Sequence, residues 1–334
     1  MALVTGNRDL RRLPKADLHL HLIGAMRPRT LRELARDQGF APPDPGRVRD
    51  WAGFVEVWHA ASVATRADPR NLDRLVRETV ADAAADGVVW LQPHFSPHSH
   101  GGPESWDALL ELVLAAGLDE AGRHGIGFGL TMGFGRHHHP DLAAELVRLA
   151  VRYADHGVRA VGLGGDEANL PAAPFAAAFA PARDAGLTVA PHAGELSGPE
   201  SVRETLRELG ATRLAHGVRA AEDPALVAWL AEHGVSLDVA VSSNLGLGVY
   251  PELADHPLAA LLDAGVRCSL SSDDSLMFGP LLGEYELARS GLGFGDERLA
   301  ALARTSLETS DAPAELILGA VAGIESWLTA PQRA

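Results

Sequence analysis

A short apolar run followed by a segment with helical spacing repeats along most of this chain, and this repeat limits the possible folds more than any other feature. Eight runs have the length and composition of buried parallel strands: residues 16–22, 88–92, 126–132, 158–163, 187–192, 213–216, 236–241 and 267–270. Helical patterns separate them at residues 71–86, 106–123, 142–156, 175–185, 199–209 and 224–233. No glycine-rich phosphate loop follows the first run, which argues against a doubly wound sheet. The sequence therefore predicts an α/β protein with a (β/α)8 TIM-barrel fold.

Two further helices are expected before the second strand. Residues 28–39 begin with proline and end with glycine, which is typical of a helix. Trp51, Phe54, Val55 and Trp58 recur at helical spacing. This aromatic face either packs onto the body of the protein or forms a lid over an aromatic substrate. We expect these additional N-terminal helices to lie near the barrel mouth and residues 1–334 to form a single domain.

The composition excludes several classes of function. The formal net charge is −15 and there is no basic run, so we expect no nucleic-acid partner. No uninterrupted apolar run approaches the roughly 18 residues of a membrane span, and the N-terminus lacks the apolar core of a signal peptide. We therefore expect a cytoplasmic protein without membrane association. Cys268 is the only cysteine and lies in an apolar run, which indicates a buried thiol and excludes an intramolecular disulfide and a cysteine-based zinc site.

Polar side chains occur where the predicted strands end, which is the catalytic face of such a barrel. His19 and His21 share one face of the first strand, and two residues along a strand advance about 6.6 Å, close enough for both imidazoles to bind one ion. Later strands end in polar groups at residues 164–167, His192 with Glu195, His216, and residues 271–274. Three histidines and one carboxylate suit Zn2+ or a neighbouring divalent ion. Glu195, His216 and Asp274 remain as a reaction centre around a metal-bound water.

Taken together, these motifs resemble the adenosine deaminase family of the metal-dependent amidohydrolase superfamily. The resemblance extends from about Leu13 to the last helices. Five motifs follow the family order: His19-Leu-His21-Leu-Ile-Gly24, Gly164-Gly-Asp166-Glu167, His192-Ala-Gly194-Glu195, His216-Gly217 and Ser272-Asp-Asp274. The sequence is most similar to an actinobacterial branch whose members act on adenosine-like compounds, including 6-aminodeoxyfutalosine.

The resemblance implies a metal cofactor and a substrate class. One zinc ion would be held by His19, His21, His192 and Asp273, and its bound water would attack C6 of a 6-aminopurine. The products would be a 6-oxopurine and ammonia, and no organic cofactor is needed. The small-molecule purine is the expected partner.

The resemblance also implies roles for the remaining site residues. Glu195 would be the general acid that protonates N1, with a pKa raised by enclosure beside the base. His216 would orient the water, take its proton or stabilise the developing oxyanion. The backbone N–H of Gly165 would contact N3, and Asp274 would contact N7.

Some positions depart from the family pattern. Members that use adenosine commonly have an acidic residue two places after the second histidine, where it binds the ribose 5′-hydroxyl, and Ile23 occupies that place here. A buried hydroxyl without a partner costs about 1–3 kcal/mol, so we expect a substrate altered at C5′ or lacking ribose. Residues 240–244 lack the usual Cys-Pro before Ser-Asn. Gln92 and His94 occupy positions where the family often has a glutamate and an arginine. The sequence therefore does not define the contacts that neighbouring residues make around the site.

Other histidines are expected to lie outside the reaction centre. Residues His137 to His139 are predicted to form a solvated turn near the site mouth, because consecutive side chains point in different directions. His94, His98 and His100 are placed in a loop after the second strand, where contact with substrate is the less favoured interpretation.

Three other functions are compatible with these residues. An adenine deaminase would use the same chemistry on the free base. Another metal-dependent hydrolase could open an amide or ester without the purine contacts of Gly165 and Glu195. A metal-retaining binding or regulatory protein is the alternative outside the enzymes, and it requires that Glu195 be unable to reach a metal-bound water.

Overall fold

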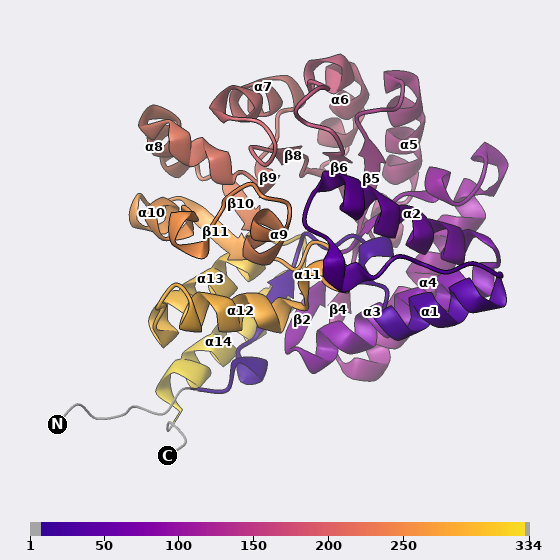
Figure 1. Ribbon diagram of the computed structural model, residues 1–334. Helices are drawn as coiled ribbons and strands as arrows, with labels where there is room; N and C mark the ends of the chain where they lie inside the picture. Colours follow the sequence, from indigo (N-terminus) through magenta and orange to yellow (C-terminus); the bar gives the residue numbers. More distant parts are fainter. Residues whose placement is uncertain (1–7, 331–334) are drawn as a thin grey trace.

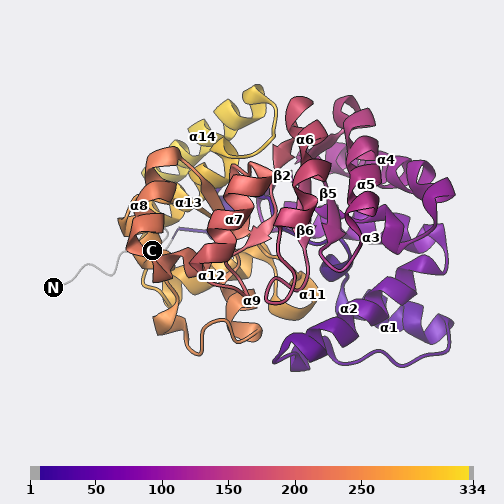
Figure 2. The same cartoon turned by 90° about the horizontal axis from the view of Figure 1, so that it is seen from above.

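The computed structural model describes residues 8–330, whose parallel strands are surrounded by helices (Figures 1 and 2). The fold is the predicted (β/α)8 barrel. Each ladder between the named strands is parallel. The strands pair in three groups: β1 (Lys15–Asp17), β2 (Val88–Leu91) and β4 (Gly127–Phe128); β3 (His94–Phe95), β5 (Leu130–Gly135), β6 (Val158–Gly164) and β7 (Thr188–Val189); and β8 (His192–Ala193), β9 (Arg213–His216), β10 (Ser236–Val239) and β11 (Arg267–Leu270).

Short bridges join these groups at the ends of the strands. Leu20 pairs with Asp273 and His21 pairs with His94, both in parallel orientation. The backbone N–H of His21 donates to the carbonyl of Asp273, and that of Asp273 donates to the carbonyl of His19, each at 2.8 Å. The segment after β1 is therefore tied to the segment after β11 on one side and to β3 on the other.

Proline separates strands at two places, directly after the second predicted strand and inside the fifth. Pro93 lies between β2 and β3, and Pro191 lies between β7 and β8. Proline has no backbone N–H to donate to a ladder, so the pairing changes partner at these points. One consequence is that His94 lies in β3, and its predicted placement in a loop was wrong.

Two further strands end earlier than predicted. The first, expected over residues 16–22, ends at Asp17 and continues only as the bridges of Leu20 and His21. The seventh, expected over residues 236–241, ends at Val239, and the chain turns at once into α9 (Val241–Gly246). An apolar pattern predicts which residues are buried and not which backbone groups pair. In both segments the side chains stay buried after the pairing between strands has ended.

The outer helices follow the predicted alternation. The six that were predicted appear as α3 (Pro69–Ala85), α4 (Trp106–His124), α5 (Pro140–Arg152), α6 (Ala176–Asp184), α7 (Pro199–Leu209) and α8 (Pro224–His233), and they are followed by α10 (Leu258–Asp263), α12 (Leu281–Ser290), α13 (Asp296–Glu308) and α14 (Ala314–Thr329). The helix expected over residues 142–156 ends at Arg152, and a 3-10 turn covers Ala154–His156. Asp223 caps α8 by accepting the backbone N–H groups of Ala225 and Leu226.

The additional N-terminal helices lie side by side near the barrel mouth (Figure 1). They are α1 (Pro28–Asp37) and α2 (Trp51–Arg66), and α2 packs on the 3-10 turn η2 (Ile23–Ala25). The Trp58 ring centroid is 5.4 Å from that of His21, and Phe54 stacks at 6.5 Å on Phe278 of α11 (Ser275–Phe278). The aromatic face of α2 therefore packs onto the body of the protein at the edge of the predicted site.

One buried apolar cluster extends from Leu10 to Trp327. Cys268 lies inside it, as predicted, and burial raises the pKa of its thiol, so the sulfur behaves as an inert part of the core. Between residues 8 and 330, no helix combines the length and the apolar content that crossing a membrane requires.

Candidate active site

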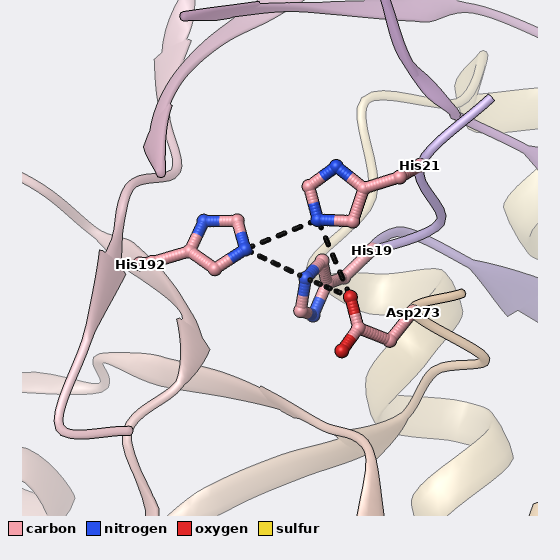
Figure 3. Close-up of side chains that lie close together, drawn as sticks. All are labelled: His19, His21, His192 and Asp273. Carbon is pink, nitrogen blue, oxygen red and sulfur yellow. Dashed lines mark hydrogen bonds and ion pairs between the residues drawn. The ribbon is translucent and has the colours of Figure 1, made fainter. Parts of the chain in front are cut away.

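Four side chains from the ends of three strands converge at one point, because His19 and His21 both follow β1. Nε2 of His192 lies 3.1 Å from Nε2 of His19 and 3.2 Å from Nε2 of His21. Oδ1 of Asp273 lies 3.1 Å from Nε2 of His19 and 3.3 Å from Nε2 of His21. Figure 3 shows the three rings and the carboxylate pointing toward one another, with His19 and His21 on one segment of the chain and His192 and Asp273 on two others. Ligand atoms bound to a tetrahedral zinc at about 2.0–2.1 Å are roughly 3.3 Å apart, so this group has the spacing of a metal site.

Hydrogen bonds on the outer side of two rings define their protonation. Nδ1 of His192 lies 3.2 Å from the carbonyl oxygen of Leu163, and Nδ1 of His19 lies 3.4 Å from that of Asp238. A carbonyl only accepts, so each Nδ1 carries a proton, and in the neutral imidazole each Nε2 presents a lone pair to the other ring. Two lone pairs 3.1 Å apart repel each other unless a cation lies between them. These residues therefore fit a divalent metal ion.

Two residues at the site have an unusual backbone conformation. Asp273 and His216 have φ values of 55° and 63°, and they are the only non-glycine residues with positive φ in the described part of the chain. Such conformations cost of order 1–3 kcal/mol each and persist where the surroundings impose them. Asp17 contributes by accepting both the backbone N–H and the hydroxyl of Ser272, at 3.3 and 2.5 Å, which holds the chain next to Asp273.

Glu195 and His216 form a second group beside the cluster of three histidines and Asp273. Oε1 of Glu195 lies 3.4 Å from Nε2 of His216, which is 3.8 Å from Oδ2 of Asp273. Burial, followed by the charge of Asp273, raises the pKa of the Glu195 carboxyl well above its usual value. Burial also lowers the pKa of His216 to about 3. The pair can therefore present a protonated carboxyl group next to a neutral imidazole.

A series of hydrogen bonds sets the tautomer of His216. The backbone N–H of Leu258 donates to Nδ1 of His256 at 3.3 Å, which leaves the proton of His256 on Nε2. This Nε2–H donates to Oδ1 of Asn244 at 3.1 Å, and the Asn244 amide donates to Nδ1 of His216 at 3.1 Å. His216 consequently carries its own proton on Nε2, the nitrogen that faces Glu195. In this state it donates a hydrogen bond to the reaction centre and cannot accept a proton there.

Asp274 follows Asp273 of the cluster and has one oxygen unsatisfied. Its side chain is buried, and Oδ1 has no hydrogen-bond partner among the described residues. Burial, reinforced by the charge of Asp273, raises the pKa of Asp274 well above its usual value. Gly24 provides the space, because a Cβ at that position would overlap the Asp274 carboxyl group. A protonated Asp274 can donate a hydrogen bond to an acceptor on a ligand.

The other predicted substrate contacts lie close to these strand ends. Gly165 follows β6 with a φ of 93°, a conformation that favours glycine. Ile23 is buried in η2, directly after the two histidines, and η2 packs against α2 and α11. Neither makes a contact that defines a role in binding.

Most of the other histidines lie outside this centre. His137 and His139 are exposed, as expected of a solvated turn, whereas His138 is half-buried with its ring centroid 4.8 Å from that of His98. His100 lies 3.3 Å from the hydroxyl of Thr65 in α2.

Three residues at the site were missed or misplaced by sequence reasoning. His94 is buried, with its ring centroid 5.0 Å from that of His21 and 5.6 Å from that of His19. Its place on a strand could have been inferred from the run before Pro93. Asn244 belongs to the Ser-Asn pair noted in the sequence, but its bonds to His216 and to His256 depend on tertiary packing, which the sequence does not reveal.

Comparison with known proteins shows which chemistry this site belongs to. The sequence profile described as adenosine deaminase matches residues 14–326. The chain belongs to the adenosine deaminase family. It is 44% identical to a Streptomyces virginiae protein named "Putative adenosine/adenine deaminase", covering 96% of this chain and 98% of the relative. It is 38% identical to the aminodeoxyfutalosine deaminase of Acidothermus cellulolyticus, covering 80% of this chain and 79% of the relative.

A solved structure shows the same architecture. The adenine deaminase of Arthrobacter aurescens matches with a TM-score of 0.84 and 26% identity, over 95% of this chain and 99% of the other. The protein is thus an aminohydrolase of the adenosine deaminase family. Family membership favours deamination over the opening of an amide or ester, and over a non-catalytic role in metal binding.

Proposed function

We propose that this enzyme catalyses the zinc-dependent hydrolytic deamination of a 6-aminopurine nucleoside, which yields the 6-oxopurine nucleoside and ammonia. One observation carries the proposal. Glu195, a buried carboxyl group with a raised pKa, lies 3.4 Å from the neutral imidazole of His216 at the edge of the three-histidine, one-aspartate cluster. A metal site with a proton donor at its edge suits hydrolysis of an amidine carbon.

The residues of the cluster have complementary tasks. His19, His21, His192 and Asp273 would hold the ion, and zinc bound there lowers the pKa of a coordinated water toward about 7. The nitrogen-rich donor set would favour zinc over magnesium or calcium, which prefer oxygen ligands.

Glu195 and His216 would act on the reacting ring. Glu195 holds a proton that it gives to N1 of the purine, which makes C6 electrophilic. His216 directs Nε2–H toward the oxygen that arrives at C6, so it orients the nucleophile and stabilises the charge that develops. The C6–N bond of the tetrahedral carbon would then break as the added hydroxyl gives its proton to the amino group, which leaves as ammonia. N1 keeps the proton from Glu195, and the proton lost by the attacking water returns Glu195 to its acid form.

Two further contacts would orient the base. Asp274, kept protonated by burial, would donate its hydrogen bond to N7, and the N–H of Gly165 would donate to N3. Both purine nitrogens accept, so both protein groups must be donors. The unpartnered Oδ1 of Asp274 is then satisfied when substrate binds.

The group at C5′ is the main determinant of the substrate. Ile23 offers no hydrogen bond to a ribose 5′-hydroxyl, so a nucleoside with an altered C5′ loses nothing there. We therefore place 6-aminodeoxyfutalosine and other 5′-substituted adenosines before adenosine. The similarity to an aminodeoxyfutalosine deaminase supports this order.

Free adenine is the second candidate substrate. Ile23 is equally compatible with a ligand that has no ribose, and the matching solved structure is an adenine deaminase. The reaction at C6 would be the same.

A substrate panel separates these possibilities. Zinc-replete protein would be assayed for ammonia release from adenosine, adenine, 5′-deoxy-5′-substituted adenosines and 6-aminodeoxyfutalosine. We expect the highest kcat/KM on a 5′-altered nucleoside, whereas turnover of adenine alone would favour the second candidate. Absence of turnover on every compound would rule out the proposed function. The matched variant Ile23→Asp should raise kcat/KM for adenosine relative to the 5′-substituted compounds, by about tenfold if a buried hydroxyl regains a partner.

A further inference from the structure

The loop that carries Glu195 is held in place by a carboxylate that has no role in the proposed reaction. Glu167 follows β6 and is only 4% exposed. Its two oxygens accept backbone N–H groups at 2.5, 2.9, 2.8 and 3.1 Å from four consecutive residues, Gly194, Glu195, Leu196 and Ser197. The hydroxyl of Ser201 at the start of α7 donates to the same carboxylate at 2.6 Å.

Four successive N–H groups that face one side of the chain form a concave anion-binding site. Here the anion is supplied by the protein itself. Hydrogen bonds to a charged acceptor are stronger than neutral ones, and leaving buried N–H groups unpaired is costly. Residues 194–197 therefore have one well-defined backbone arrangement for as long as Glu167 is present.

His192, which lies in β8 just before this loop, is held by other groups. Arg136 donates to the carbonyl oxygen of His192 at 2.6 Å, and the ring of His192 is hydrogen-bonded to the carbonyl of Leu163. The contacts of Glu167 begin at Gly194, after this point. Loss of Glu167 should thus act on Glu195 and leave the metal ligand in place.

We propose that Glu167 is the positioning residue for Glu195, because it fixes the backbone of residues 194–197 so that the Glu195 carboxyl group stays aimed at the reacting ring. This inference builds on the role proposed for Glu195. Glu167 does not touch the substrate and acts only through the loop. A glutamine has one acceptor oxygen and places an amide N–H against the backbone donors, so Glu167→Gln removes the arrangement without changing side-chain size.

The first test compares Glu167→Gln with Glu204→Gln. Glu204 lies on α7 and makes one weak contact, at 3.4 Å to the N–H of Ala172, so its variant removes the same charge nearby without affecting the loop. We expect Glu167→Gln to lower kcat about 10- to 100-fold with bound zinc and KM close to wild type, and Glu204→Gln to stay within about twofold. Equal kcat values for the two variants would overturn the proposal.

A double-mutant cycle distinguishes positioning from a general structural role. If Glu167 acts through Glu195, adding Glu167→Gln to Glu195→Gln should produce little further loss of kcat. A second loss as large as that of Glu167→Gln alone would show that Glu167 acts elsewhere, and would overturn the proposal. If Glu167→Gln fails to fold, Ser201→Ala can be used instead, because it removes one of the five hydrogen bonds to the Glu167 carboxylate. We expect it to lower kcat about two- to fivefold, and this loss should disappear in the Glu195→Gln background. An unchanged kcat in Ser201→Ala would count against the proposal.

A measurement without substrate separates this inference from the proposed function. Backbone hydrogen exchange of residues 194–197 should be slow in wild type and in Glu204→Gln, and at least tenfold faster in Glu167→Gln or Ser201→Ala. Unchanged exchange would refute the role of Glu167 even if deamination is confirmed. Faster exchange in Glu167→Gln, together with no turnover of any 6-aminopurine by the wild type, would confirm that Glu167 fixes the loop and would refute the proposed function.

Discussion

Burial has opposite effects on the two proton-carrying residues of the site. It raises the pKa of Glu195, for which the neutral form is the protonated one, and lowers the pKa of His216, for which the neutral form has lost a proton. A single dry environment thus prepares a proton donor and a neutral imidazole side by side. Enzymes commonly use such environments to set the protonation states of neighbouring groups.

Replacing Glu195 with glutamine should abolish most of the activity and retain the metal. The amide cannot deliver a proton to N1, and general acid catalysis contributes about 10²- to 10⁴-fold. We expect kcat to fall by that factor, with zinc content by elemental analysis unchanged. Glu200→Gln on the exposed start of α7 is the control and should keep full activity. Turnover of Glu195→Gln at the wild-type rate would exclude Glu195 as the acid.

The tautomer of His216 is predicted to depend on His256. His256→Leu leaves Oδ1 of Asn244 without its donor, whereas His256→Gln retains an N–H that can replace it. We expect kcat to fall about 5- to 100-fold in the leucine variant, as a lost buried hydrogen bond of about 1–3 kcal/mol would produce, and to recover substantially in the glutamine variant. The 15N shifts of the His216 ring report the tautomer directly. An unchanged Nε2–H state in His256→Leu would contradict the prediction.

At the scale of elements, the site depends on close contact between turns at the barrel end. The turn η2 meets the segment after β11 where Gly24 faces Asp274. Gly24→Ala should displace the Asp274 carboxyl group and so weaken orientation of the purine. We expect kcat/KM to fall about tenfold or more, measured by ammonia release, while zinc content is maintained.

Gly319→Ala is the matched control for this change. Gly319 lies in α14 with open space where a Cβ would be placed, and alanine favours helix. This variant should retain full activity and be slightly more stable. If Gly24→Ala were equally active, close packing at Gly24 would have no part in binding.

Much of this arrangement was predictable at the scale of elements. The apolar runs gave the strand positions, and polar residues at their ends identified His19, His21, His192 and Asp273, which the structure brings together. Such an inference works because parallel strands of a barrel end at one face. It also indicated Glu195 and His216, which the structure places in contact.

Other features could not be predicted because they arise from tertiary packing. The positive φ of Asp273 is imposed by pairing with the segment after β1, which the local sequence does not reveal. The hydrogen bonds from His256 through Asn244 join residues whose spacing carries no motif. The early end of β1 could not be predicted either, because its alternating apolar residues remain buried after the backbone ladder stops.

At the scale of the whole molecule, the cluster proposed to bind the metal joins the first and the last strand of the barrel. His19 follows the first strand, and Asp273 follows the last. The cluster exists only in the folded barrel, so an ion that binds there stabilises the fold. At zinc concentrations of about 100 Kd, binding should increase the free energy of unfolding by about 2.7 kcal/mol. For a chain of this size, this increase should raise Tm by roughly 5 °C.

Removal of the metal should therefore lower Tm by roughly this amount, and added zinc should restore it. Thermal unfolding followed by circular dichroism before and after chelation measures the change. Asp273→Asn weakens one ligand and should show a much smaller zinc-dependent shift. A wild-type Tm that does not respond to chelation or to zinc would contradict metal binding at this cluster.

The most direct test of the account is a zinc titration of the metal-free enzyme, with ammonia release measured on adenosine, adenine and a 5′-substituted adenosine. The account predicts no significant turnover without metal and activity that rises to a plateau at one zinc per chain, highest on the 5′-substituted nucleoside. Full activity in the metal-free protein, or no turnover of any 6-aminopurine at saturating zinc, would contradict it.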